Sequence, residues 1–147
     1  MIIVDTREQK PWDFSFYGHE VTVAKLEYGD YSIAGKTDQI FIERKATTGE
    51  LSNNLCTDIG YRRFNAEMER SGEARKVLIC EFPENYMETF PEKSGIPKSK
   101  HKFIRISAKF LRKRLHEIVD KYSVEVYFNN TIGEAEELAL KILSEYI

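Results

Sequence analysis

The order of hydrophobic and polar residues along the chain predicts an α/β protein. Strand-like patterns occupy residues 1–7, 20–28, 31–35, 39–45, 76–82 and 124–128. The first four are short, and glycine-containing turns follow the second and the third, so we expect an antiparallel meander at the amino-terminal end. Segment 76–82 (KVLICEF) is almost continuously apolar, which is typical of a strand buried on both faces.

Apolar residues with helical spacing appear in three places. Pairs four positions apart indicate helical structure over residues 51–68, and residues 107–122 form an amphipathic pattern. The last helix is predicted to begin at Thr131, with Glu134 in capping-box spacing. Strands and helices in this order favour a mixed sheet covered by helices.

Two segments are predicted to lack regular structure. Proline and glycine break up residues 9–19 and the longer stretch 83–103. Loops as long as the second are usually functional or mobile. The first contains a group of aromatic residues that we expect in the core or an interface rather than stacked on bases, namely Trp12, Phe14, Phe16 and Tyr17.

Composition narrows the class of protein. With 147 residues, 41% hydrophobic and 31% charged, the chain is expected to form one soluble domain, residues 1–147. Cys56 and Cys80 are far apart and are interpreted as reduced, and the histidines form no zinc-binding cluster. We find no signal peptide or transmembrane pattern, so we expect an intracellular protein, in the cytoplasm or the nucleus or nucleoid, with no membrane partner.

The clearest chemical signal is a set of charges at the end of a core strand. Ile42 is followed by Glu43, Arg44 and Lys45, and Asp30 precedes this strand in a turn. Two carboxylates can bind a hard divalent cation, and a neighbouring lysine can orient water or offset charge on a phosphate. The alternative is a same-face surface pair of Glu43 and Lys45 worth about 0.2–1 kcal/mol, with Asp30 as an ordinary turn residue.

The flanking motifs favour the catalytic interpretation. Six short segments, in this order, resemble the XPF-type nuclease domain: VDTRE (4–8), GDY (29–31), IERK (42–45), EL (50–51), RRF (62–64) and VLICEF (77–82). This domain is a branch of the PD-(D/E)XK restriction-endonuclease-like superfamily, found in structure-selective nucleases of DNA repair and recombination. The resemblance implies a restriction-endonuclease-like mixed β-sheet flanked by α-helices. We see no helix-hairpin-helix module.

The resemblance also implies roles for individual residues. Asp30 and Glu43 would bind Mg²⁺ or Mn²⁺, Lys45 would be the catalytic lysine, and Asp5 would be a further ligand, directly or through water. Arg7, Glu8 and Arg44 would surround the site, the arginines contacting phosphate or fixing a carboxylate. The alternative for Arg7 and Glu8 is a solvated salt bridge.

One position departs from the family pattern. The aspartate expected three residues after the ERK motif is replaced by Gly49, and the next residue, Glu50, precedes Leu51 as that aspartate would precede a leucine. Glu50 is therefore either a further site residue or only a helix-terminal carboxylate. If Glu50 fills the role, Gly49→Asp is expected to have little effect.

A basic stretch indicates where nucleic acid would bind. Residues 93–116 contain no acidic residue but include Lys93, Lys98, Lys100, Lys102, Arg105, Lys109, Arg112, Lys113 and Arg114. Since the net charge is only −2, this stretch stands out as an electrostatic footprint for phosphates. The alternative is a solvated helix face and a charged loop.

The sequence thus predicts a metal-dependent DNA endonuclease acting on branched or flapped DNA in repair or recombination. One alternative is a non-catalytic DNA-binding or partner-organising domain, which Gly49 favours. Another is an RNA-cleaving nuclease with the same metal chemistry. The resemblance also implies a homodimer or pairing with another subunit of a nuclease complex.

Overall fold

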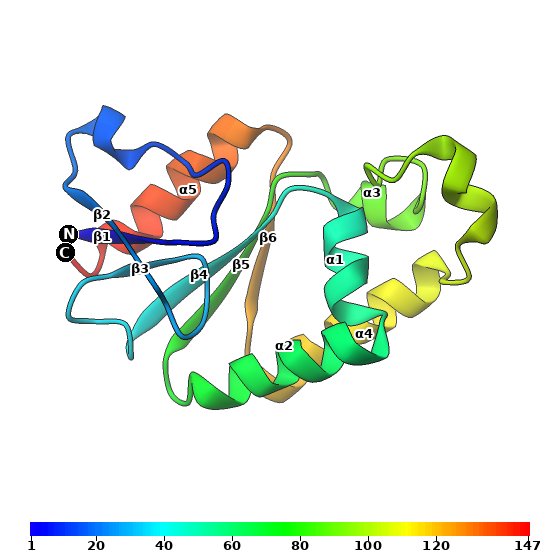
Figure 1. The fold of residues 1–147 in the computed structure, drawn as a ribbon, viewed down its shortest axis with the longest axis horizontal. Helices are drawn as coiled ribbons and strands as arrows, with labels where there is room; N and C mark the ends of the chain where they lie inside the picture. The colour runs from blue at the N-terminus through cyan, green and yellow to red at the C-terminus, as the bar shows by residue number, and fades with distance from the viewer.

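The computed structural model describes residues 1–147 and shows one six-stranded sheet with helices on both faces (Figure 1). The strands, in spatial order β2-β1-β3-β4-β5-β6, are β1 (Ile2–Asp5), β2 (Val21–Ala24), β3 (Tyr31–Ile33), β4 (Ile40–Lys45), β5 (Arg75–Cys80) and β6 (Glu125–Phe128). The helices are α1 (Thr48–Leu55), α2 (Asp58–Arg70), α3 (Asn85–Glu88), α4 (Ala108–Tyr122) and α5 (Ile132–Ser144), with 3₁₀ helices η1 (Phe14–Tyr17) and η2 (Lys98–Phe103). The mixed α/β sheet predicted from the sequence is confirmed.

The predicted antiparallel meander is wrong for β2. This edge strand runs parallel to β1, with Val21 opposite Ile2, whereas the β1–β3 and β3–β4 pairs are antiparallel. Two parallel strands cannot be joined by a tight hairpin and need a longer crossover. Here the crossover buries Trp12 and Phe14, which pack in the core together with residues of β1 and α5.

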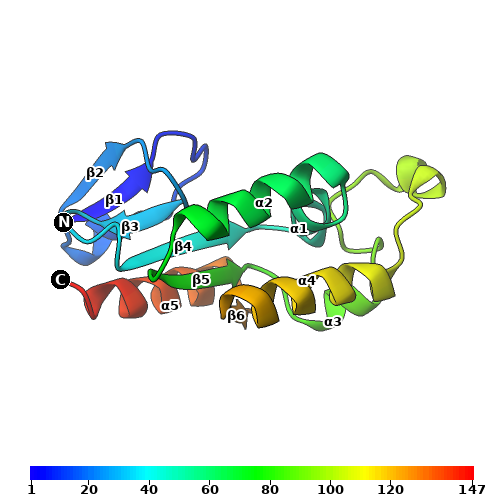
Figure 2. The same cartoon turned by 90° about the horizontal axis from the view of Figure 1, so that it is seen from below.

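β4 and β5 separate two hydrophobic cores. Phe41 and Leu78 face a core shared with α1, α2 and α4, whereas Ile42 and Ile79 face a core shared with α5 and the crossover. Figure 2 shows α2 and α5 on opposite faces of the sheet. Because side chains alternate along a strand, the charges at the end of β4 are divided between these two faces.

The helix starts follow the sequence closely. The predicted helix start at Thr131 is confirmed, since Thr131 Oγ1 accepts the Glu134 N–H; the Glu134 side chain reaches back to the N–H of Asn130, one residue before the cap, rather than to that of Thr131. The start of α1 is built in the same way around Thr47 and Glu50. None of the helices is both long and apolar enough for a membrane crossing.

Residues 83–106 form a lobe at the end of the molecule opposite β1 and β2 (Figures 1 and 2). The prediction of irregular structure for 83–103 is wrong in part, because α3 and η2 lie within it. Met87 and Phe90 anchor the lobe in the core, and the Ser94 carbonyl accepts the Gly49 N–H of α1 at 3.1 Å. These contacts give order to a segment that has no hydrophobic periodicity of its own.

Candidate active site

The end of β4 brings an acidic and a basic side chain together. Glu43 and Lys45 alternate with Arg44, so both point to the face covered by α1 and α2. Glu43 is only 7% exposed, and Lys45 Nζ lies 3.3 Å from Glu43 Oε2. Since both groups are largely removed from water, each depends on the other for compensation of its charge.

Asp30 is held beside this pair by the backbone of β4. Its N–H donates to the Ile42 carbonyl at 2.8 Å, and its Oδ2 atom accepts the Arg44 N–H at 2.8 Å. These two bonds fix the turn before β3 against the last residues of β4. The structure therefore gathers Asp30, Glu43 and Lys45 at one place.

Burial and mutual repulsion shift the pKa values in this group. Burial raises the pKa of Asp30 well above its ordinary value, and the charge of Glu43 adds to this effect. Burial also raises the pKa of Glu43, although the ammonium of Lys45 opposes the shift. Burial disfavours the charged form of Lys45, but the carboxylates of Glu43 and Asp30 raise its pKa overall. One cation thus faces the buried carboxylate of Glu43 and the half-buried carboxylate of Asp30, and the group is short of positive charge.

Glu67 on α2 is a candidate that sequence reasoning missed. Its carboxyl group lies against that of Glu43 and raises the pKa of Glu43, while its Oε1 atom accepts the Gly29 N–H at 2.7 Å. Gly29 has a φ of +79°, and a Cβ atom there would collide with the Phe41 ring, so this turn requires glycine. The periodicity of α2 drew attention only to apolar positions such as Met68, the residue that follows Glu67.

Asp5 is linked to Asp30 by its backbone N–H, which donates to the Asp30 carbonyl at 2.9 Å, but its carboxylate has other partners. Its Oδ1 atom accepts the Leu26 N–H at 2.8 Å, and its Oδ2 atom accepts Arg7 Nε at 2.6 Å. Despite its burial, these hydrogen bonds lower the pKa of Asp5. One oxygen thus holds the segment that passes from β2 to β3 and the other holds Arg7, and the role of Asp5 as a metal ligand, directly or through water, stays a prediction.

Arg44 points to the opposite face, where it is held by two carboxylates. Its guanidinium lies 3.2 Å from Glu8 Oε2 and 3.2 Å from Glu81 Oε2, and it stacks over the Trp12 ring at 5.0 Å. Trp12 Nε1 donates to Glu81 at 2.9 Å, and the Tyr31 hydroxyl donates to Glu8 at 2.8 Å. Arg44 therefore fixes carboxylates, one of the two roles expected from the sequence. Glu81, whose side chain is 2% exposed, was missed because it lies in the segment 76–82, which was interpreted only as a buried strand.

Glu50 lies at the first turn of α1, beside the end of β4. Its Oε2 atom accepts the Ala46 N–H at 3.0 Å, which is the helix-terminal role considered for it. It also lines a hollow of about 420 Å³ together with Arg7, Glu8 and Arg44, which we call the strand-end hollow. At Gly49, a Cβ atom would collide with the Ser94 carbonyl and lie 3.2 Å from Ile96, so the lobe itself excludes an aspartate there.

The residues present fit a divalent cation in part. No group of three His, Cys, Asp or Glu side chains converges so that it could hold a metal ion. Asp30 and Glu43 nevertheless offer the oxygen atoms that Mg²⁺ or Mn²⁺ prefers, in a site short of positive charge. Mg²⁺ is commonly held by one or two carboxylates, with water and phosphate oxygens as its other ligands.

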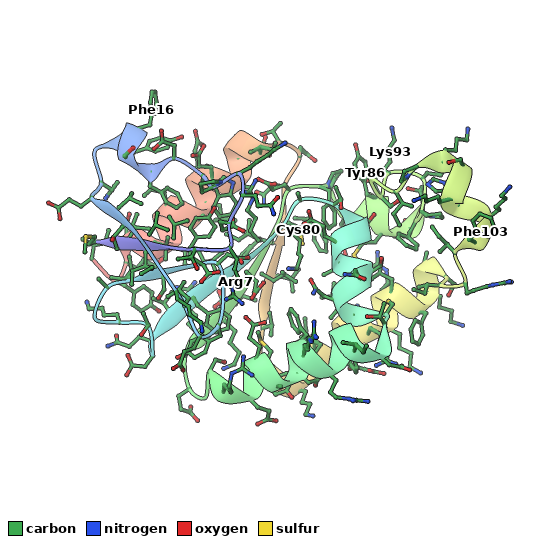
Figure 3. All side chains as sticks on the ribbon, in the orientation of Figure 1. Arg7, Phe16, Cys80, Tyr86, Lys93 and Phe103 are labelled. Carbon is green, nitrogen blue, oxygen red and sulfur yellow. The ribbon has the colours of Figure 1, made fainter.

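The predicted DNA-binding residues are spread over the lobe and α4. Lys98, Lys100 and Lys102 are exposed on η2, and Arg105 follows it. Lys109 and Lys113 are exposed on α4. In contrast, Arg112 pairs with Glu84 at 3.2 Å and with Glu88 at 3.3 Å, so its charge is already compensated. Arg7 lies apart from the lobe (Figure 3) and is 69% exposed although it binds Asp5.

The sheet and its flanking helices are those of a restriction-endonuclease-like domain. The family model described as the ERCC4 domain matches residues 4–141, and the chain therefore belongs to the ERCC4 domain family. Among curated proteins, none matches the sequence.

Solved structures give the same fold. XPF from Aeropyrum pernix superposes with a TM-score of 0.67 at 17% sequence identity, over 99% of this chain and 66% of that chain. XPF from Aeropyrum pernix in complex with DNA gives 0.67 at 19% identity, over 99% of this chain and 63% of that chain. At this identity the similarity establishes the fold, and our chain spans just under two thirds of the length of these relatives.

Proposed function

We propose that this chain is a divalent-metal-dependent DNA endonuclease that hydrolyses phosphodiester bonds in branched or flapped DNA of repair and recombination. The observation that carries the proposal is the buried carboxylate of Glu43 at the end of β4, with the Lys45 ammonium on it and the half-buried Asp30 held beside it by the Arg44 N–H. Ionising both carboxylates beside a single cation is costly, and a bound divalent cation would remove this cost in the way that protonation does. Membership of the ERCC4 domain family supports the same conclusion.

Asp30 and Glu43 would hold Mg²⁺ or Mn²⁺. When bound, the ion supplies Lewis-acid activation of the phosphate and lowers the pKa of a bound water. Lys45 keeps its proton because the neighbouring carboxylates raise its pKa. Its N–H groups not used by Glu43 can orient water or offset negative charge on the scissile phosphate.

The surrounding charged residues would position this machinery. Arg44, between Glu8 and Glu81, holds the end of β4 in place. Asp5 and Arg7 brace the segment that leads to Asp30. In this proposal the lysines of η2, together with Arg105, Lys109 and Lys113, contact DNA phosphates, since they are exposed and have no acidic neighbours in sequence.

The test is cleavage of labelled linear, flapped, forked and four-way DNA, with single-stranded RNA alongside, in Mg²⁺, Mn²⁺ or chelator. Glu43→Gln and Asp30→Asn should each lower the rate by about 100-fold or more, the order expected when a group that stabilises transition-state charge is removed. Glu137→Gln, an exposed change on α5, is the matched control. Full activity in Glu43→Gln would refute the site, and preferential cutting of RNA would reassign the substrate.

The non-catalytic alternative has specific support. Gly49 stands where the family pattern has an aspartate, and no group of three His, Cys, Asp or Glu side chains is arranged so that it could hold a metal ion. A DNA-binding or partner-organising domain would bind the same branched DNA without cutting it in either metal.

Sedimentation of the chain alone and with DNA tests the proposed homodimer or pairing with another nuclease subunit.

A further inference from the structure

An apolar groove of about 430 Å³ lies between α1 and the lobe. Its apolar lining comes from the lobe side and consists of Phe90, Ile96, Phe103, Ile104 and Ile106. Gly49, Ser52 and Asn53 of α1 form the facing wall. A groove of this volume is within the range of pockets that bind small molecules, which is about 300–1,000 Å³.

Phe103 distinguishes this groove from an ordinary surface depression. Its side chain is 69% exposed and projects from the end of the molecule (Figure 3). Lys102 Nζ lies 5.2 Å from the centroid of the Phe103 ring. An exposed aromatic face next to a cation is the combination on which an unstacked nucleobase can lie while its phosphate is neutralised.

The charges around the groove select the kind of ligand. Lys98, Lys100 and Lys102 precede Phe103 on η2, and Arg105 lines the groove itself. No acidic residue occurs between Lys93 and His116 in sequence. A ligand with flat apolar faces and a polyanionic backbone matches both features, and exposed Asn53 offers an amide for the edge of a base.

The groove lies next to the strand-end hollow without sharing any of its lining residues. Gly49 lines the groove, whereas Glu50, the next residue, lines the strand-end hollow. Two consecutive residues in the first turn of α1 thus line the two hollows. A base can enter the groove only when it is unstacked, which excludes the interior of a regular duplex.

We propose that the apolar groove binds an unstacked base of a single-stranded DNA segment, with Phe103 as the stacking platform and the lysines of η2 and Arg105 on the phosphates. The identity of the ligand rests on the proposed function, but none of the groove residues belongs to the proposed metal site. The groove thus favours substrates in which a single-stranded branch leaves the duplex close to α1.

Binding without cleavage tests this inference. Fluorescence anisotropy in chelator would measure the affinity of the full chain for labelled oligo-dT and for a duplex of equal length. Phe103→Ala should weaken oligo-dT binding by about 5- to 100-fold, the loss associated with removal of one base–aromatic stack, and should change duplex binding less than about twofold. Phe103→Trp keeps an aromatic face and should restore binding.

Phe16→Ala is the matched control, because Phe16 is 82% exposed but lies on η1, at the other end of the molecule (Figure 3). Unchanged oligo-dT affinity in Phe103→Ala, as expected if the groove docks a protein segment instead, would overturn the inference. Equal losses for oligo-dT and duplex would also overturn it.

The experiments distinguish a failure of the nuclease proposal from a failure of the base-binding proposal. Selective loss of oligo-dT binding in Phe103→Ala supports the groove even if no metal supports cleavage. Conversely, metal-dependent cutting with unchanged oligo-dT affinity in Phe103→Ala retains the nuclease and removes the base-binding groove.

Discussion

The carboxylate of Glu67 accepts the backbone N–H of Gly29 at 2.7 Å, which ties α2 to the turn that carries Asp30. The same carboxyl group lies against Glu43. Glu67 is thus connected to both carboxylates of the proposed metal site. It binds the backbone of Gly29, the neighbour of Asp30, and its side chain lies against that of Glu43.

Replacement of Glu67 should therefore affect both stability and the site. Glu67→Ala is expected to lower the free energy of unfolding by about 1.5–3 kcal/mol, the contribution typical of a hydrogen bond to a charged group. Glu67→Gln retains an acceptor for Gly29 and should recover most of this loss. Urea denaturation measures the effect, with exposed Glu73→Ala as the control. Equal stability of Glu67→Ala and Glu73→Ala would show that the turn does not need this bond.

The carboxylates of Asp30 and Glu43 predict a characteristic pH dependence of the free energy of unfolding. Burial raises the pKa of both Asp30 and Glu43, so in the interval above their ordinary values the folded state binds more protons than the unfolded state. The contribution of these groups to the free energy of unfolding therefore falls as the pH rises through that interval. Glu43→Gln should lessen the fall, and Mg²⁺ should offset it by supplying positive charge.

Thermal denaturation from about pH 5 to pH 8, in chelator or in Mg²⁺, would measure this contribution. The comparison is the difference in melting temperature between the wild type and Glu43→Gln at each pH. A difference that does not grow with pH in chelator would contradict the raised pKa of Glu43.

Gly49→Asp should destabilise the protein, contrary to the expectation from sequence. The added side chain would collide with the Ser94 carbonyl and press on Ile96. Overpacking of this kind costs about 1–3 kcal/mol. Chemical denaturation checks the value, and Gly49→Ala should show a loss of similar direction. Wild-type stability in both variants would mean that the lobe moves away from α1 without cost.

Glu81 should be far more important for stability than its place after a core strand suggests. Glu81→Ala leaves Arg44 without one of its two carboxylates in a largely buried network, and breaking such a pair costs about 3–5 kcal/mol. Trp12, the only tryptophan, contacts both residues, so its fluorescence reports the change directly. Glu84→Ala, which breaks an exposed pair with Arg112, should cost less than about 1 kcal/mol.

The lysines of η2 should control the salt dependence of DNA binding. The charge reversals Lys98→Glu and Lys100→Glu are expected to weaken DNA binding, because each lysine would neutralise a phosphate. The slope of log affinity against log salt should fall by at least about 0.7 for each single-strand phosphate that is no longer neutralised. Lys141→Glu, an exposed change on α5, provides the control. An unchanged slope would remove η2 from the DNA path.

Local patterns were sufficient for much of this architecture. The apolar runs of β4 and β5, the helical spacing of α2 and α4 and the helix start at Thr131 all depend on residues close together in sequence. The ERK motif likewise indicated its chemistry, because three charges at the end of a buried strand cost desolvation free energy unless partners compensate them. The mixed α/β fold and its family could be predicted on this basis.

Tertiary structure decided the features that depend on residues far apart in the chain. The parallel direction of β2 goes with the burial of Trp12 and Phe14 in the crossover. The alternation of apolar and polar residues within the strand does not reveal this direction. The Leu26 N–H, 21 residues away in the chain, donates to one oxygen of Asp5, and Arg7 donates to the other.

The interactions of Glu67 and Glu81 are likewise long-range. Glu67 meets Gly29, and Glu81 meets Arg44 and Trp12, only when the sheet and α2 have assembled. A sequence determines which side chains carry charge and which segments are strands or helices, since these depend on local chemistry. Which charges meet, and therefore which form a site, is determined by packing, because only packing removes them from water and brings them within hydrogen-bonding distance.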